Sequence, residues 1–271
     1  MNPFLSSLSG KLAERWVATL VLPGALFVAA AVCAVRLGHR SAFDLVSVIG
    51  WIVREAPRVP VAATAVFVLA GATATAMAAQ AVGSLAEAVW TRPWRGPAAW
   101  LARGLVAVRG RLFDRAAARA GVDPVAAYRP RHPAWIGERF RLLNARISGQ
   151  YHGLDLSLVW PRLWLLVPET VRTPVQAAES QFRSATRLVG WGVLYLGLGI
   201  HWFPAALAGI GTIAVGWSRA RSTTATLTTL IEGTVDTHLD TIVTALGHTM
   251  PAAGFTGDLA RRINDRLAKG D

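Results

Sequence analysis

Cysteine, lysine and acidic residues are scarce in this 271-residue chain. The single cysteine, Cys33, excludes an intrachain disulfide. Lys and Arg total 28 against 16 Asp and Glu, and the only lysines are Lys11 and Lys269, an Arg bias typical of a GC-rich bacterial genome. A formal charge of +12 suits nucleic-acid binding. Here, however, the basic residues lie between and beside apolar segments, where membrane topology explains them, and we expect no nucleic-acid partner.

Familiar catalytic and cofactor motifs are missing as well. The sequence has no Walker loop, no Gly-x-Ser-x-Gly, no paired cysteines and no His-Glu-x-x-His. Asp236, His238 and Asp240 are metal-ligating residue types, but on one helix His238 points away from the other two. We therefore expect a protein that is not an enzyme and uses no cofactor or metal.

Charge is absent altogether from three apolar stretches, residues 16–35, 59–86 and 188–218. A hydrocarbon core of ~30 Å takes about 20 helical residues, so each of the first two can cross a bilayer once. The third would be ~47 Å long as one helix, and the sequence His-Trp-Phe-Pro at 201–204 interrupts it. We expect a hairpin of two transmembrane helices there, with a non-crossing re-entrant loop as the alternative.

These features predict an all-α polytopic membrane protein with about four transmembrane helices and an Arg-rich helical cytosolic region. Pro23 predicts a kink near Leu20 in the first span. The predicted segments are, in order, an amphipathic helix (1–15), transmembrane helix 1 (16–35), an external interfacial loop (36–58), transmembrane helix 2 (59–86), a basic cytosolic helical region (87–187), the transmembrane hairpin (188–218), and a cytosolic amphipathic helix with a tail (219–271).

Loop charge predicts the orientation. With four crossings, both termini and residues 87–187 share one side, and only four arginines lie on the other: Arg36, Arg40, Arg54 and Arg58. The positive-inside rule places the basic side in the cytoplasm, so we expect a multi-pass protein of the inner (cytoplasmic) membrane with both termini cytoplasmic.

Small residues recur every four positions in the second apolar stretch: Gly71, Thr75, Ala79 and Gly83. Such a stripe lets another helix approach closely. The partner is either a helix of the same chain or a second copy.

Arginine dominates the central region. A helix is expected over 97–122 and a second over 134–148, each with one apolar face. Six arginines are expected to meet anionic lipid headgroups: Arg103, Arg109, Arg111, Arg115, Arg119 and Arg162.

An acidic stripe, Glu232, Asp236 and Asp240, follows on a helix that begins after Arg221. Like charges four residues apart repel on a helix, so something cationic should face them. The Arg-rich region is one candidate, and a partner protein is another.

The most distinctive strings are Tyr151-His-Gly-Leu-Asp155, Trp160-Pro-Arg-Leu163 and Pro168-Glu169. They resemble a Tyr-Gly-x-Asp element followed by Trp-Pro-Arg-Leu in uncharacterised multi-pass bacterial membrane proteins, where a hydrophobic hairpin comes next. The resemblance covers residues 141–221 and begins with Arg141-Leu-x-Asn144, but His152 departs from it. It implies membrane residence and no known activity. Pro161 is expected to start a short helix, and Arg162 to contact lipid phosphate or Asp155.

The function expected from these observations is a non-enzymatic scaffold or partner-binding protein at the cytoplasmic membrane. The alternative is an oligomeric pore or transport component, assembled along the stripe from Gly71 to Gly83.

Overall fold

Helices make up the secondary structure of this chain wherever the computed structural model describes it, which is over residues 21–55, 60–123, 128–252 and 254–268. No β-strand occurs in these ranges, so the all-α prediction is confirmed. The amphipathic helix expected over 1–15 and the kink expected near Leu20 lie outside the described residues.

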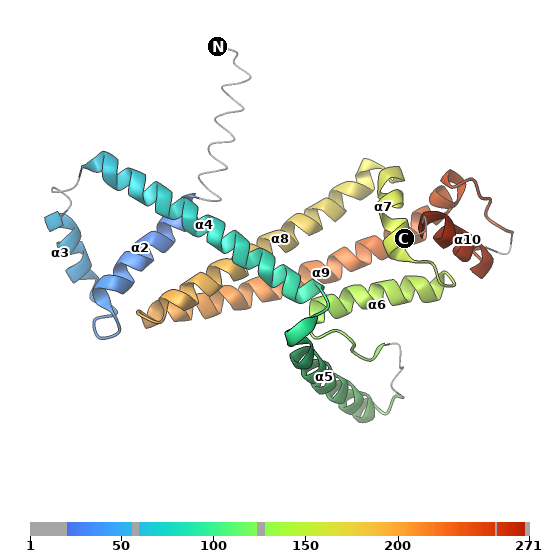
Figure 1. Ribbon diagram of the computed structural model, residues 1–271, viewed down its shortest axis with the longest axis horizontal. Coiled ribbons are helices and arrows are strands. Elements are labelled where there is room, and N and C mark those ends of the chain that lie inside the picture. The colour runs from blue at the N-terminus through green and yellow to red at the C-terminus, as the bar shows by residue number, and fades with distance from the viewer. Residues whose placement is uncertain (1–20, 56–59, 124–127, 253, 269–271) are drawn as a thin grey trace, which may run out of the picture. The chain divides into compact units, whose positions relative to one another are not determined.

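The described helices follow one another as Figure 1 shows: α2 (Leu22–Leu37), α3 (Leu45–Glu55), α4 (Val61–Thr91), the 3₁₀ turn η3 (Gly96–Ala98), α5 (Ala99–Ala120), α6 (Trp135–Gln150), α7 (Leu156–Leu166), α8 (Glu169–Leu198), α9 (Phe203–Ala245) and α10 (Gly257–Ala268). They form two compact units. We call Met1–Ala86 with Ser184–Ser218 the apolar unit, and Glu87–Arg183 with Arg219–Asp271 the basic unit. Helices α8 and α9 contribute to both.

The hairpin break expected at 201–204 is present, because α8 ends at Leu198 and α9 begins at Phe203. The two arms are the ends of much longer helices than the apolar stretch alone suggested, since α8 begins at Glu169 and α9 runs on to Ala245. The hairpin turn contacts the loop after α2. Trp202 Nε1 of the turn donates a hydrogen bond to Ala42 O of the loop (2.9 Å), and His39 Nε2 of the loop lies 2.9 Å from Ile200 O of the turn.

Backbone-to-backbone contacts at glycine hold the apolar unit together. A Cβ on Gly24 of α2 would collide with the backbone of Ala72 in α4, and one on Gly209 of α9 would lie 2.7 Å from Gly192 O in α8. Lipid supplies no hydrophobic drive between helices, so close approach of this kind is how membrane helices gain packing energy.

Large apolar side chains cover the outside of the apolar unit. Val61, Val66, Phe67 and Met77 of α4 are each more than three-fifths exposed. Among the described residues, α4 alone is long and apolar enough to cross a membrane by length and composition, and only 11% of its apolar window is buried. The core helix of a soluble protein is mostly buried, so this exposure favours membrane association.

The basic unit has a conventional core of aliphatic side chains. Helices α6, α7, α9 and α10 meet there through Ile147, Leu163, Ile242 and Ile263, all with 1% exposure or less. Burial of each such side chain contributes about 1.5–3 kcal/mol. The core therefore fixes these four helices against one another.

The helix expected to start at Pro161 starts earlier. Asp155 is the N-cap of α7, and its carboxylate accepts a hydrogen bond from the Ser157 N–H (2.8 Å), so Pro161 lies inside the helix. An Asp N-cap satisfies a free N–H group of the first turn, which explains why the cap sets this boundary.

The string from Tyr151 to Asp155 forms the turn between α6 and α7. His152 and Gly153 have φ values of 49° and 96°, and the side chain of Leu154 is fully buried. Asn264 of α10 holds the turn, with its side-chain oxygen accepting from Asp155 N (3.1 Å) and its amide donating to Gly153 O (2.9 Å). Glycine is needed at position 153 because residues with a Cβ rarely adopt a φ of 96°.

Candidate functional site

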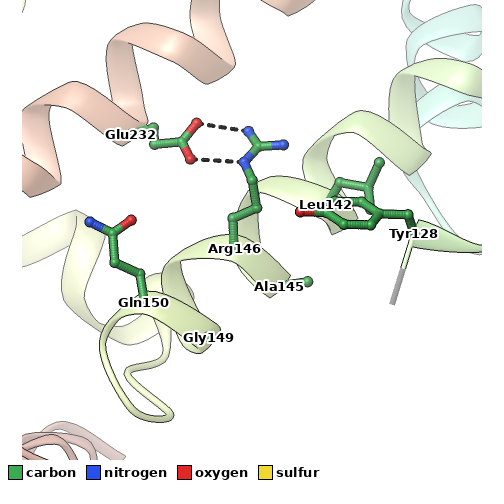
Figure 2. Close-up of a pocket in the computed structure, with 7 residues that line it drawn as sticks. All are labelled: Tyr128, Leu142, Ala145, Arg146, Gly149, Gln150 and Glu232. Atoms are coloured by element: carbon green, nitrogen blue, oxygen red, sulfur yellow. Dashed lines mark hydrogen bonds and ion pairs between the residues drawn. The ribbon is translucent and has the colours of Figure 1, made fainter. Parts of the chain in front are cut away.

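The acidic stripe of α9 is bound by α6 through an ion pair. Arg146 of α6 donates from Nε and Nη2 to the two carboxylate oxygens of Glu232, both at 2.8 Å, as Figure 2 shows. Each side chain is 25% exposed. Hydrogen bonding to Arg146 holds the pKa of Glu232 below its ordinary value, although desolvation opposes the shift. The same hydrogen bonds raise the pKa of Arg146. The expectation that an arginine of the central region faces this stripe is therefore confirmed at Glu232.

Asp236 also contacts α6 and the turn after it. It accepts hydrogen bonds from the Tyr151 hydroxyl (2.7 Å) and Gln150 Nε2 (3.4 Å). Burial, and then the hydrogen bond to Asp236, raise the pKa of Tyr151, so the phenol stays protonated as a donor. Asp240, one turn further, is exposed and accepts from the adjacent Thr241 N–H (2.8 Å). Two of the three carboxylates thus serve to join helices of the basic unit.

A shallow cleft of about 430 Å³ lies beside the Arg146–Glu232 pair. Figure 2 shows its lining residues: Tyr128, Leu142, Ala145, Arg146, Gly149, Gln150 and Glu232. The two charged residues of the lining neutralise each other. Apolar side chains and the paired charges both contribute to the lining.

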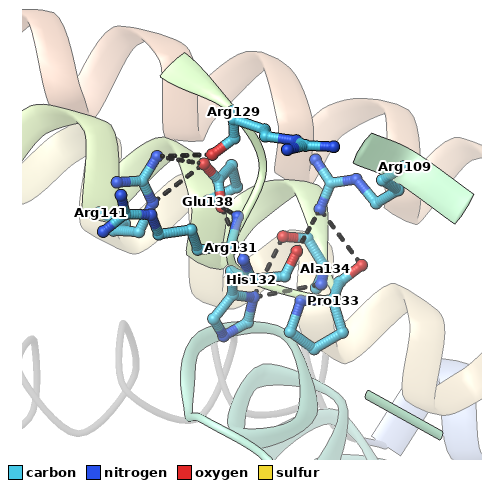
Figure 3. A network of polar contacts seen from close by, with 8 residues as sticks. All are labelled: Arg109, Arg129, Arg131, His132, Pro133, Ala134, Glu138 and Arg141. Carbon is cyan, nitrogen blue, oxygen red and sulfur yellow. Dashed lines mark hydrogen bonds and ion pairs between the residues drawn. The ribbon is translucent and has the colours of Figure 1, made fainter. Parts of the chain in front are cut away.

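A second polar network organises the loop before α6. Glu138 is 4% exposed, and it accepts from the backbone N–H groups of Arg131 (2.9 Å) and His132 (2.7 Å) and from Arg141 Nε (2.9 Å) and Nη2 (2.6 Å), as Figure 3 shows. Burial alone would raise the pKa of Glu138, but the hydrogen bonds from Arg141 and the two backbone groups outweigh it and lower the pKa. Four hydrogen bonds to one carboxylate satisfy this buried charge.

His132 completes the same network. Its Nδ1 accepts from the Ala134 N–H (3.1 Å), and its Nε2 lies 3.2 Å from Arg92 O. The ring packs on Gly137, where any Cβ would collide with it. Within this loop the histidine therefore acts as a structural bridge.

Arg109, one of the six arginines expected to meet lipid, belongs to this network as well. It is half-buried, and its Nη1 donates to His132 O (2.6 Å) and Pro133 O (3.2 Å). Desolvation lowers its pKa, with Glu138 opposing the shift. Its described contacts connect α5 to the loop.

The other arginines of α5 lie on its surface. Arg103, Arg111, Arg115 and Arg119 are exposed and form no ion pair among the described residues. An apolar stripe on α5 is also exposed, by 44–56%: Leu101, Leu105, Val108 and Leu112. At ~100° per residue, Arg115 and Arg119 continue this stripe, whereas Arg103 and Arg109 point to other sides of the helix.

Arg162, the sixth arginine, is half-buried in α7. It donates to Leu158 O (2.7 Å) and to Leu267 O at the end of α10 (3.3 Å). A cation suits the last carbonyls of a helix. Its described contacts are thus with carbonyl groups, and none is with Asp155.

The small-residue stripe of α4 packs inside the apolar unit. A Cβ on Gly83 would lie 2.8 Å from Thr186 O in α8, Ala79 is fully buried against Gly190, and Gly71 faces Val28 of α2. Thr75 turns its hydroxyl to Gly71 O (2.9 Å). Of the two partners left open for this stripe, the structure supplies helices of the same chain.

Sequence reasoning missed Glu138, His132 and Tyr151 as contact residues. Glu138 did carry a signal, since an acidic residue in the first turn of an expected helix favours interaction with free N–H groups. Comparison with known proteins adds nothing to these assignments, because no family model, curated protein or solved structure matches the chain.

Proposed function

We propose that this protein is a non-enzymatic scaffold of the cytoplasmic membrane, anchored by several crossing helices and docked on the inner leaflet by α5. The observation that carries the proposal is the exposed apolar surface of the apolar unit. Valines, leucines and phenylalanines of α2, α4 and the α8–α9 hairpin point outward there, including Leu26, Phe67 and Leu207, each more than three-fifths exposed. Such a surface is stable in hydrocarbon and would aggregate in water.

Crossing of the hairpin is supported by its contacts with the loop after α2. If residues 36–58 are external, the turn at Ile200–Trp202 must reach the same membrane face, because His39 and Ala42 contact it. A re-entrant loop on the opposite side would not meet that loop. We therefore favour four crossings with both termini in the cytoplasm.

Docking by α5 is supported by its two exposed features. An apolar stripe with adjoining arginines is the pattern of a helix that lies in the plane of a membrane surface. Each Arg near an anionic surface contributes about 1 kcal/mol, and the leucines add burial in the interface. The cleft between α6 and α9 then provides the surface for a partner protein.

Packing within one chain disfavours the alternative, a pore assembled on the stripe from Gly71 to Gly83. Ala79 and Gly83 are buried against α8, so this face of α4 is occupied within one chain.

The experiment is alkaline carbonate extraction of native membranes that carry a photoreactive residue at Ala145, in the α6–α9 cleft. The full-length protein should stay in the pellet, and Ala145 should yield one discrete cross-linked protein band. The same residue at Ala118, on the surface of α5, is the control and should yield no such band.

Two results would contradict the proposal. Protein in the carbonate supernatant would exclude membrane integration, and identical band patterns from Ala145 and Ala118 would exclude a partner site at the cleft.

A further inference from the structure

A large apolar cleft lies among α2, α3 and α4 of the apolar unit. Its volume is about 1050 Å³, at the upper end of small-molecule sites. Fourteen residues line it, of which only Arg36 and Glu55 are charged. Thr64 also contributes, but its hydroxyl donates to Pro60 O (3.3 Å).

Helices α2 and α4 approach most closely at their glycine residues. Gly24 meets the backbone of Ala72 there, and Val28 lies against Gly71. Beyond that crossing the two helices separate, and α3 lies across the wide end, as Figure 1 shows for this unit. Arg36 in the last turn of α2 and Glu55 at the end of α3 both lie at the wide end, so the cleft is apolar inside and charged at its rim.

The depth of the cleft matches one leaflet of a bilayer. Its lining on α2 runs from Ala25 to Arg36, a rise of ~16 Å at 1.5 Å per residue. Half of a hydrocarbon core of ~30 Å is about 15 Å. A lipid with its head group at the rim would therefore reach the crossing at Gly24 with the end of its acyl chain.

Arg36 places a guanidinium group at the rim of the cleft. Its guanidinium carbon lies 4.0 Å from the centre of the Trp51 ring, a cation–π contact that holds the charged group near the ring. Among the described residues, Arg36 forms no hydrogen bond or ion pair. A guanidinium matches phosphate oxygens in pairs, and Arg with Trp is a typical combination at the membrane interface.

We propose that this cleft binds one membrane glycerophospholipid, with an acyl chain between α2 and α4 and the phosphate against Arg36. The proposal rests on the proposed membrane location. It adds a lipid site in the leaflet opposite to the one that α5 contacts.

Cys33 lines the cleft and provides a native reporter, since it is the only cysteine. The experiment measures alkylation of Cys33 by N-ethylmaleimide in full-length protein purified in lipid-free detergent, with dioleoylphosphatidylethanolamine added stepwise. The lipid should slow alkylation severalfold, whereas oleic acid, which lacks the phosphate, should have a much weaker effect at equal concentration. Arg36→Gln should raise the lipid concentration needed for half protection by about tenfold.

The matched control is Arg40→Gln, an exposed arginine nearby that does not line the cleft and should leave protection unchanged. Ala29→Phe fills the cleft, so it should protect Cys33 without lipid and remove any further lipid effect.

Two results would overturn the inference: unchanged Cys33 alkylation with lipid, or protection that rises with protein concentration alone, which would assign the cleft to a second copy. If the protein stays in the carbonate pellet, either of these results contradicts the lipid site alone. The proposed function would then still stand.

Discussion

Glu232 and Asp236 lie one helical turn apart on α9, where two carboxylates repel each other. Arg146 neutralises the first, and the Tyr151 hydroxyl donates to the second. The Arg146–Glu232 pair is bidentate and three-quarters buried, so it stabilises the fold more than an exposed pair does. Removing one partner leaves the other charge buried without a hydrogen bond. This desolvation accounts for most of the expected loss in the free energy of unfolding.

Glu232→Gln should lower the free energy of unfolding by about 1–3 kcal/mol at pH 7. The pKa of Glu232 is lowered in the folded state, so its contribution is present above the ordinary value of 4.5 and is lost as the pH falls through the lower folded pKa. The difference between wild type and variant should therefore shrink below about pH 4.5. Denaturant unfolding in detergent, monitored by circular dichroism at several pH values, measures this difference in the free energy of unfolding.

Glu179→Gln is the control, because Glu179 pairs with Arg183 on the exposed surface of α8, with side-chain exposures of 41% and 67%. It should change the free energy of unfolding by less than about 0.5 kcal/mol. Equal effects of the two substitutions would contradict the assignment of the α6–α9 ion pair as a stabilising contact.

Helix α5 has internal contacts on one side and exposed apolar side chains on another. Its protein-facing side holds Arg109 against the carbonyls of the loop before α6. The adjoining side exposes the stripe from Leu101 to Leu112, followed by Arg115 and Arg119. Substituting Arg109 would disturb the loop as well as any lipid contact, so a test of membrane docking has to use arginines outside this network.

Arg115→Gln should weaken docking of α5 on anionic membranes by about 1 kcal/mol, roughly a fivefold change in the ratio of docked to free helix. A lipid-reactive photoprobe at Val108 in proteoliposomes reports docking through its yield of lipid adduct. Adduct yield should fall in the variant and also when anionic lipid is replaced by neutral lipid.

Arg103→Gln makes the same change in charge on another side of α5, where Arg103 lines a small cleft with Trp94 and His132, and should leave the yield unchanged. Equal losses from the two substitutions would indicate a general charge effect instead of docking through the apolar stripe.

The protein as a whole combines an apolar unit whose surface suits lipid with a basic unit whose core is that of a water-soluble bundle. The apolar unit packs through glycine and alanine, whereas the basic unit packs through leucine, isoleucine and valine. The proposed membrane location accounts for this difference, because burial of large side chains stabilises packing in water, whereas close backbone approach does so in lipid.

The proposed topology predicts which positions are reached from outside the cell. In a Cys33→Ala background, single cysteines at Ser41 and His201 should react with a membrane-impermeant maleimide in intact spheroplasts. A cysteine at Val122 should react only after permeabilisation. All three positions are exposed in the structure. A cysteine at His201 that reacts only after permeabilisation would favour the re-entrant loop over the crossing hairpin.

Local patterns in the sequence predicted the helices and their breaks well. The break at 201–204 and the helices over 97–122 and 134–148 are present, because Pro, Gly and apolar periodicity act over a few residues. Pro161 was placed wrongly because a stronger local signal, the Asp155 cap, starts α7 earlier. The acidic stripe required a cation, but nothing in the sequence identified Arg146 among so many arginines.

Hydropathy and charge along the chain were enough to predict an all-α protein, because each of these properties belongs to a segment by itself. Contacts between segments distant in the chain assigned Arg109 and Arg162 to backbone carbonyls, placed the α4 stripe against α8, and opened the cleft beside Arg36. Those features depend on how helices approach one another, and a helix of given composition is compatible with many such arrangements.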